Sequence, residues 1–373
     1  MKLSSLFLFL FFLPRLTQAE IPETLLLTPP QQKYLRQLIQ TNPDAKALWL
    51  KAEREAKGYL NDQPRPLKVI HYEGLLDTNP NRIDTEKSLR DMDKLAAWLF
   101  AYYATQDEAY AKNAKEYIVA WANTYQPTGN PINENKFEPL IHSYQTLRKY
   151  FSPDERERVQ TWLSKIAAAE IAYPHMPQNN WKTKQIKLVG TIGLIVGRED
   201  FERYAVEDLK KYIDHALYDD GETFDLRQRD AMGYHVSGLK PLLVIAITMD
   251  QFRNDKGGIK IFDYQNPAGG SIRKSVDYVV PYALGEKVHE EWVNTKVELD
   301  RQRAAAGLAH YQPGVPYEAE RSRELFELAS YFDPEYQKVL RHLAGGGNQE
   351  FDSWFAMLIT AVRSGKNEPG SKN

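Results

Sequence analysis

Apolar residues recur at intervals of three and four along almost the whole chain, and this periodicity constrains the fold more than any other feature of the sequence. Between Glu86 and Tyr103 the apolar positions form one stripe of a helix, and the segment from Phe201 to Ala216 repeats the pattern. The same spacing predicts further helices near residues 30–40, 43–59, 108–123, 137–150, 153–171, 181–197, 234–251, 318–331, 334–344 and 350–363. Such a chain buries one face of each helix against its neighbours.

Strand signals are few by comparison. The best short runs of β-branched and aromatic residues are Ile259–Tyr264 and Val276–Val280, and no motif repeats with a fixed period. Helices joined by short turns rich in Pro, Gly and Asn predict an all-α fold with few or no strands. We expect helical hairpins arranged as an α/α toroid, an incomplete barrel, in one domain over residues 20–364, followed by a disordered tail at 365–373.

Residues 1–19 have the features of a cleavable secretory signal peptide. Lys2 supplies the positive charge, the apolar run from Leu3 to Leu13 follows, and Ala19 stands at the expected cleavage position. The run is too short to span a bilayer, and no later run is expected to be long enough for a membrane helix. The sequence therefore predicts a periplasmic or secreted protein that is not held in a membrane.

Composition excludes several kinds of chemistry. The chain has no cysteine, which rules out disulfides, thiolate catalysis and Cys-ligated metal sites. None of its eight histidines forms a His-x-x-x-His pair, so no metal site and no cofactor is predicted, although surface Asp residues leave a structural Ca²⁺ open. With 48 basic against 50 acidic side chains, bulk binding to nucleic acid is not expected. Nothing in the sequence indicates an oligomeric state.

Three polar segments interrupt the helical pattern and carry the candidate site residues. The first is a loop that enters a helix within the stretch 171–198, which contains no Asp or Glu in 28 residues. A helix N-terminus with amide side chains and lysines attracts anions, although a capped turn beside a solvated basic face has the same pattern. The candidates in this segment are His175, Asn179, Asn180, Trp181 and Lys182.

The second segment, Asp219–His235, places two arginines, a tyrosine and a histidine at or before the first turn of a helix. Arginine suits a carboxylate and Tyr and His carry protons, but a core tyrosine and an arginine paired with a nearby acid also fit. The third segment, Thr128–Pro139, is Asn-rich and is typical of a turn. The candidates here are Arg227, Arg229, Tyr234, His235, Asn133 and Asn135.

Several short motifs, in their order and spacing, resemble the alginate lyase family, polysaccharide lyase family 5 and its relatives. The motifs are Arg227–Leu239 with Tyr234-His235, the pair Asn179-Asn180 about fifty residues upstream, His71–Gly74, Glu86–Arg90 and the helix ending at Trp121-Ala122. The resemblance covers roughly residues 68–250. It implies an α/α toroid and β-elimination of a β-1,4-linked uronic-acid polymer, so the implied partner is an acidic polysaccharide such as alginate or glucuronan.

The resemblance also implies roles for individual residues. Tyr234 takes the position of the base that removes the C5 proton and of the acid that protonates O4, which lie on the same side in β-linked mannuronate or glucuronate. Arg227 takes the position of the arginine seven residues before that tyrosine, and Asn179 and Asn180 that of the pair that neutralises the carboxylate.

The chain departs from the family pattern at two positions. The family has His directly after the Asn pair, where this chain has Trp181, and Lys where it has His71. His175 and His235 are therefore candidates for the missing imidazole. These exchanges make a polyglucuronate or a mixed polyuronate an alternative to alginate as the substrate.

Two other functions fit the sequence. An α/α-toroid glycoside hydrolase needs two carboxylates that flank the scissile bond, and a non-catalytic periplasmic polysaccharide-binding protein would explain the missing histidine. The carboxylates available to a hydrolase are Asp219, Asp220, Glu222, Asp225 and the two acids of His289-Glu290-Glu291.

Overall fold

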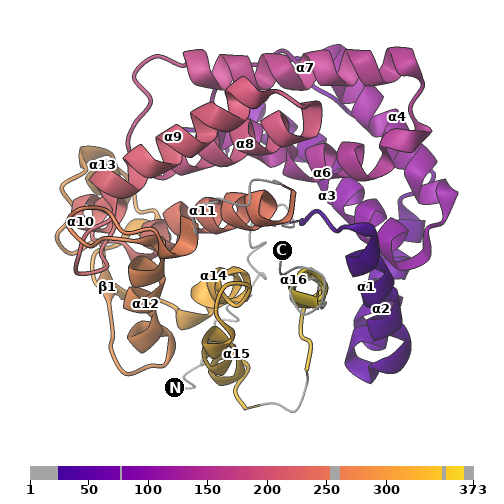
Figure 1. Ribbon diagram of the computed structural model, residues 1–373. Coiled ribbons are helices and arrows are strands. Elements are labelled where there is room, and N and C mark those ends of the chain that lie inside the picture. Colours follow the sequence, from indigo (N-terminus) through magenta and orange to yellow (C-terminus); the bar gives the residue numbers. More distant parts are fainter. Residues whose placement is uncertain (1–23, 76–77, 253–260, 347–349, 365–373) are drawn as a thin grey trace, which may run out of the picture.

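The computed structural model describes residues 24–75, 78–252, 261–346 and 350–364, and these are mostly helical. Consecutive helices lie side by side in pairs and curve around the centre of the molecule, which is the predicted α/α toroid (Figure 1). The predicted signal peptide and the tail at 365–373 lie outside the described residues.

The helices and strands follow one another without a regular repeat of length. Up to the middle of the chain they are α1 (Pro29–Thr41), α2 (Pro43–Gly58), α3 (Pro80–Thr105), α4 (Glu108–Thr124), α5 (Pro131–Glu134), η1 (Asn135–Phe137), α6 (Glu138–Leu147), η2 (Arg148–Tyr150), α7 (Pro153–Ala172), α8 (Asn180–Val196) and α9 (Glu199–Ala216). The remainder are α10 (Phe224–Arg229), α11 (Met232–Phe252), η3 (Ile261–Asp263), α12 (Ile272–Ala283), β1 (Glu290–Glu291), α13 (Glu298–Ala305), η4 (Ala309–Tyr311), β2 (Val315–Pro316), η5 (Ala319–Ser322), α14 (Arg323–Ala329), η6 (Pro334–Tyr336), α15 (Gln337–Leu343) and α16 (Trp354–Ser364).

Local signals explain where many of these helices begin and end. α7 starts with a capping box, in which the N–H of Glu155 donates to Ser152 Oγ at 3.2 Å and the N–H of Ser152 donates back to the Glu155 carboxylate at 2.8 Å. Proline occupies the first position, where its missing N–H costs nothing. α8 ends at Gly197, whose φ of 72° is the left-handed conformation that closes a helix.

Both strand predictions are wrong where the structure describes them. Val276–Val280 lies inside α12, since Ile272, Val276 and Val279 are buried at helical spacing and Ser271 caps the helix. Of Ile259–Tyr264, residues 261–263 form the 3₁₀ turn η3 and residues 259–260 lie outside the described residues. β-Branched residues pack equally well on a helix face when their period is 3.6. The strands among the described residues are β1 and β2, which pair antiparallel.

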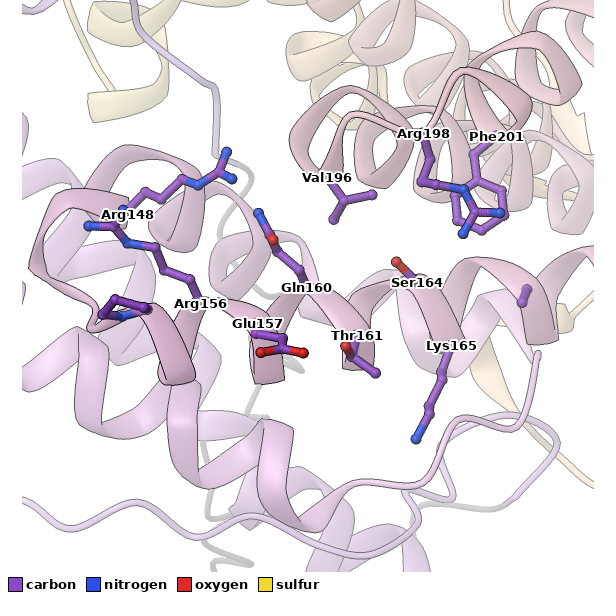
Figure 2. Close-up of a pocket in the computed structure, with 12 residues that line it drawn as sticks. Arg148, Arg156, Glu157, Gln160, Thr161, Ser164, Lys165, Val196, Arg198 and Phe201 are labelled. Atoms are coloured by element: carbon purple, nitrogen blue, oxygen red, sulfur yellow. The ribbon is translucent and has the colours of Figure 1, made fainter.

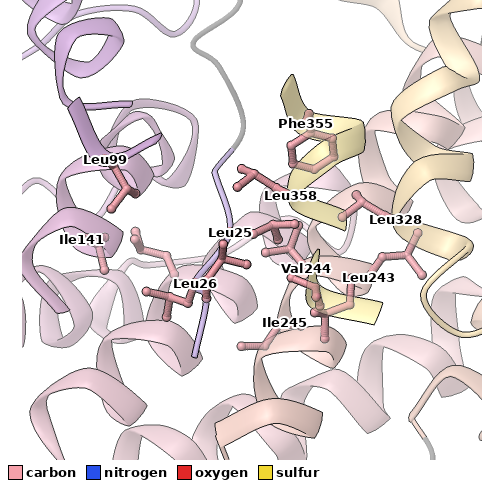
Figure 3. Packing of buried hydrophobic residues seen from close by; sticks show 14 of the residues in the cluster. Leu25, Leu26, Leu99, Ile141, Leu243, Val244, Ile245, Leu328, Phe355 and Leu358 are labelled. Atoms are coloured by element: carbon pink, nitrogen blue, oxygen red, sulfur yellow. The ribbon is translucent and has the colours of Figure 1, made fainter. Parts of the chain in front are cut away.

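The extended N-terminal segment fills the middle of the toroid. Leu25 is 1% exposed, and the Thr24 hydroxyl lies 2.7 Å from Nδ1 of the buried His142. Figure 3 shows Leu25 and Leu26 between Leu99 and Ile141 on one side and Leu243, Val244 and Leu358 on the other. The core is therefore closed by residues from both ends of the chain.

α11 runs through this core. Among the described residues it is the helix that is long and apolar enough to cross a membrane, which corrects the expectation that no such stretch follows residue 19. Most of it is buried inside the protein, including Leu239, Leu242 and Ile245, so its apolar character serves the packing of the toroid.

Close packing of α8 against α9 and α11 sets the position of the site. A Cβ on Gly193 would lie 2.9 Å from the backbone nitrogen of Glu202, so only glycine allows α8 and α9 to approach this closely. A Cβ on Gly238 of α11 would lie 3.4 Å from Asp225 of α10 and 4.0 Å from Cβ of Asn180. The beginnings of α8 and α11 and the short helix α10 therefore meet at one place.

Candidate active site

Tyr234 lies half-buried in the first turn of α11, and two neighbours fix its ring. The guanidinium carbon of Arg229 lies 4.2 Å from the ring centroid, within the range of a cation–π contact. The indole of Trp292 meets the ring edge-on, with centroids 5.7 Å apart and planes at 81°. A proton-carrying side chain is thus held in one orientation at the accessible end of a buried helix.

The segment between β1 and β2 packs on Tyr234, and we call it the second wall of the site, α10 and the start of α11 being the first. Trp292 is 7% exposed and also packs on Tyr311, with ring centroids 4.9 Å apart. Arg303 covers the other tyrosine, with its guanidinium carbon 4.8 Å from the Tyr311 centroid. Burial and the neighbouring Tyr234 hydroxyl raise the pKa of Tyr311. Each of the two tyrosines is therefore covered by an arginine, Tyr234 by Arg229 and Tyr311 by Arg303.

The backbone is strained at this wall. Trp292 has φ of 70° and Asp230 has φ of 51°, a region that side chains rarely adopt. The N–H of Trp292 donates to the carbonyl of Asp230 at 2.7 Å, and the Asp230 carboxylate accepts from both nitrogens of Asn294. Such strain persists only where its surroundings enforce it, and it gathers at functional sites.

Buried carboxylates hold the arginine beside Tyr234. Arg229 Nη1 donates to both oxygens of Asp300 at 2.5 and 2.7 Å, and its Nε lies 3.9 Å from Asp225. Asp300 and Asp225 are each 1% exposed. Burial raises the pKa of Asp225 to about 6, against the opposing effect of Arg229 and Lys184. The site is thus a desolvated network of charges in which positions are well defined.

Arg227, two residues from Arg229, points to different partners. It pairs with Asp220 and Glu222, and its guanidinium carbon lies 3.5 Å from the centroid of Tyr218. No hydrogen bond, ion pair or ring contact joins it to Tyr234 among the described residues. The structure therefore places Arg229, and not Arg227, against the tyrosine.

The predicted amide pair opens α8 as expected. Asn179 is the N-cap, with Oδ1 accepting from the N–H of Trp181 at 3.0 Å. Asn180 is buried in the first turn, next to Asp225 and Gly238. Trp181 is half-buried, and its ring centroid lies 6.0 Å from that of Tyr173. The helix N-terminus and its amides thus face the same place as α10 and the start of α11.

Of the remaining basic candidates, Lys182 and His235 are buried and His175 is exposed. Lys182 is buried and bonds to Asp208 of α9. His235 is fully buried, with Nδ1 3.0 Å from the Thr223 hydroxyl and Nε2 2.8 Å from the Ser275 carbonyl, and burial lowers its pKa to about 4. These positions correct the expectation that Lys182 and His235 contact substrate. His175 is exposed in the loop before α8.

The other candidates from the N-terminal half are His71 in the loop before α3, Asn133 in α5 and Asn135 in η1. Asn133 is buried and its Oδ1 accepts from the N–H groups of Tyr72 and Glu73 at 3.1 and 3.0 Å, so it holds the loop that carries His71. His71 is exposed and its own N–H donates to the Thr85 hydroxyl. Asn135 follows in η1, half-buried. Asn133 therefore acts on the loop and is not itself available to a ligand.

An open groove of about 690 Å³ lies at a different place, between α7 and the junction of α8 and α9 (Figure 2). Its basic lining residues are Arg148, Arg156, Lys165 and Arg198. It contains none of the predicted site residues. We therefore assign the site by its chemistry to the region of Tyr234 and treat the groove as a separate surface.

Comparison with known proteins finds solved structures with the same fold. An alginate lyase from Bacteroides ovatus has a similar structure, with a TM-score of 0.64 at 16% identity over 90% of this chain and 98% of that one. Alginate lyase A1-III from Sphingomonas species A1 gives a TM-score of 0.51 at 18% identity, over 77% and 91% of the two chains. A tyrosine-to-phenylalanine variant of A1-III complexed with a tetrasaccharide gives 0.53 at 18% identity, over 70% and 80%.

Identities this low show a shared fold, and the match of the sequence to a family profile shows the family. The protein is a polysaccharide lyase with an α/α-toroid fold. It belongs to the alginate lyase family, whose profile matches residues 36–289. Among curated protein sequences no match is found. The match ends before Trp292, Asp300, Arg303 and Tyr311, so the second wall of the site is built from residues beyond it.

Proposed function

We propose that this protein cleaves a β-1,4-linked polyuronate, alginate or polyglucuronate, by syn β-elimination with Tyr234 as base and acid. The observation that carries the proposal is the position of Tyr234, half-buried at the start of α11 with the Arg229 guanidinium 4.2 Å from its ring centroid. A guanidinium beside the ring stabilises the negative charge that the phenol oxygen carries while it exchanges protons with the substrate.

The elimination breaks the C5–H and C4–O4 bonds and forms the C4–C5 double bond and the O4–H bond. Tyr234 removes the proton from C5, the C5 electron pair forms the C4–C5 double bond, and the C4–O4 bond breaks as O4 takes a proton from the same hydroxyl. The C5 proton is poorly acidic until the charge of the adjacent carboxylate is offset. The amides of Asn179 and Asn180 and the positive end of the α8 dipole supply that offset in this proposal.

The geometry favours Arg229 over Arg227 as the arginine of the site. Arg227 is engaged by Asp220 and Glu222, whereas Arg229 contacts the ring of Tyr234. The proposed partner is an acidic polysaccharide. The leader-like residues 1–19 support a periplasmic or secreted location for the enzyme.

The test is the substitution Tyr234→Phe, which deletes the hydroxyl and keeps the ring that packs on Trp292. We expect kcat to fall by about 10²–10⁴-fold, as for other general acid–base groups, with a smaller change in KM. The measurement is the absorbance of the unsaturated uronate formed from polymannuronate and from polyglucuronate, with the melting temperature recorded alongside.

The matched control is Tyr331→Phe, which removes a hydroxyl that donates to Asp250 at 2.5 Å toward the other end of α11. We expect elimination to stay near the wild-type rate in this variant. A folded Tyr234→Phe protein that eliminates at the wild-type rate would overturn the role of Tyr234. New reducing ends without the unsaturated product would indicate a hydrolase, and intact polymer with measurable binding would indicate a binding protein.

A further inference from the structure

The cations around the contact between α8 and α11 are nearly all paired. Lys187 bonds to Glu138, Lys240 to Glu324 and Arg229 to Asp300. Lys136 lies over the ring of Tyr72, 4.5 Å from its centroid. A substrate carboxylate that approached any of the three ion-paired cations would have to compete with a carboxylate of the protein.

Lys184 differs from these neighbours. Its Nζ donates to the neutral hydroxyl of Ser237 at 3.3 Å, and it forms no ion pair with a carboxylate among the described residues. Lys184 follows Asn180 by one turn of α8, and Ser237 follows Tyr234 by about one turn of α11, so each pair shares a helix face. The half-buried residue Lys184 therefore lies one turn below the amide and the phenol that the proposed reaction uses.

The electrostatic surroundings leave this cation without a full counter-charge. Burial and the ammonium groups of Lys187 (α8), Lys136 (η1) and Lys240 (α11) lower the pKa of Lys184 to about 7. Asp225 (α10) opposes this effect, but it is shared with Arg229. An anion that binds beside Lys184 would therefore stabilise its ammonium form.

We propose that Lys184 binds a uronate carboxylate of the polymer and takes up a proton as the polymer binds. The inference rests on the proposed polyuronate function and adds a specificity residue to it. Because only the ammonium form attracts a carboxylate, binding requires no proton uptake below pH 7, where free Lys184 is already charged. Above pH 7 binding must recharge the neutral amine, so affinity should fall by up to about tenfold per pH unit.

The experiment measures binding in the Tyr234→Phe protein, so that elimination does not consume the ligand. Tetramannuronate and tetraglucuronate are titrated by calorimetry at pH 6 and pH 8.5, each in two buffers with different ionisation enthalpies. We expect uptake of most of one proton at pH 8.5 and little at pH 6. Adding Lys184→Gln should abolish the uptake and weaken binding at pH 6 by about 100-fold, toward the upper end of the range for one charged hydrogen bond.

Two further variants separate a binding role from a structural one. Lys184→Arg, which stays charged, should bind at both pH values without proton uptake. Lys165→Gln, an exposed lysine on α7, should behave like its parent protein. Unchanged affinity or unchanged proton uptake in a folded Lys184→Gln protein would overturn this inference alone. If neither oligosaccharide binds at either pH, both the inference and the proposed function fail.

Discussion

The groove along α7 and the region of Tyr234 are both rich in cations, yet they are built in opposite ways. The groove is hollow, and its charges meet solvent. Lys165 is exposed, and Arg198 pairs with Asp200 only two residues away. Around Tyr234 the acidic partners are 1% exposed, and a tryptophan is held at a positive φ. Desolvated charge and enforced geometry mark a place of chemistry more specifically than a hollow does.

The sharpest test of this comparison uses the two arginines of α10. Arg229→Gln should lower kcat/KM by about 10²-fold, the effect of removing one group that stabilises developing charge. Arg227→Gln should lower it by less than about tenfold, because its charge is already offset by Asp220 and Glu222. Formation of the unsaturated product measures both effects.

Arg229→Gln also leaves Asp300 without its main partner, and breaking a buried pair costs about 3–5 kcal/mol. The double variant Arg229→Gln/Asp300→Asn removes both charges and serves as the control for folding. It should recover most of the lost melting temperature and none of the activity. A larger loss of activity in Arg227→Gln than in Arg229→Gln would return the role to Arg227.

These arginines also show why the sequence predicted the fold better than the site. Most of the helices follow from local periodicity, and the cap at Asn179 follows from local chemistry. The choice between Arg227 and Arg229 depends on the direction in which each side chain leaves a six-residue helix. His235 is adjacent to Tyr234 in sequence, but a step of about 100° around α11 turns it into the core.

The second wall had no signal that local reasoning could detect. Trp292, Asp300 and Tyr311 lie in a region of short, irregular elements. Trp292 contacts Tyr234 and Asp300 contacts Arg229 across more than fifty residues of chain, and Tyr311 packs on Trp292. Aromatic and charged residues in such a region are usually read as surface. Only the tertiary structure shows that Trp292 is buried between two tyrosines.

An effect of intermediate size, on the pH dependence of stability, is expected for a substitution on the buried face of α7. Glu170 lies against Glu134, and burial and that neighbour raise the pKa of Glu170 well above its ordinary value. The folded protein thus keeps a proton that the unfolded chain loses near pH 4.3. The stability contribution is complete below that pH and falls as pH rises toward the pKa of the folded state.

Glu170→Gln removes this titration, so its melting temperature relative to wild type should rise steadily between pH 5 and pH 9. Glu155→Gln on the same helix is the matched control. Hydrogen bonds from Ser152 and Lys115 lower the pKa of Glu155, so its contribution is present above pH 4.3 and lost in acid. That variant should be less stable by a constant amount from pH 5 to pH 9. A pH-independent difference for Glu170→Gln would show that the carboxyl is ionised in the fold.

The smallest effect is expected in the α7 groove, and it bears directly on the comparison. The double variant Arg148→Gln/Lys165→Gln removes two of its cations while leaving its shape nearly unchanged. Because the side chain of Lys165 is exposed and Arg148 has no ion pair among the described residues, stability should stay within about 0.5 kcal/mol of wild type. kcat/KM on either polyuronate should change by less than about twofold. A loss of tenfold or more in kcat/KM, with the melting temperature unchanged, would mean that the polymer also occupies the groove. A hollow shape would then be as good a guide to the functional site in this protein as buried charge.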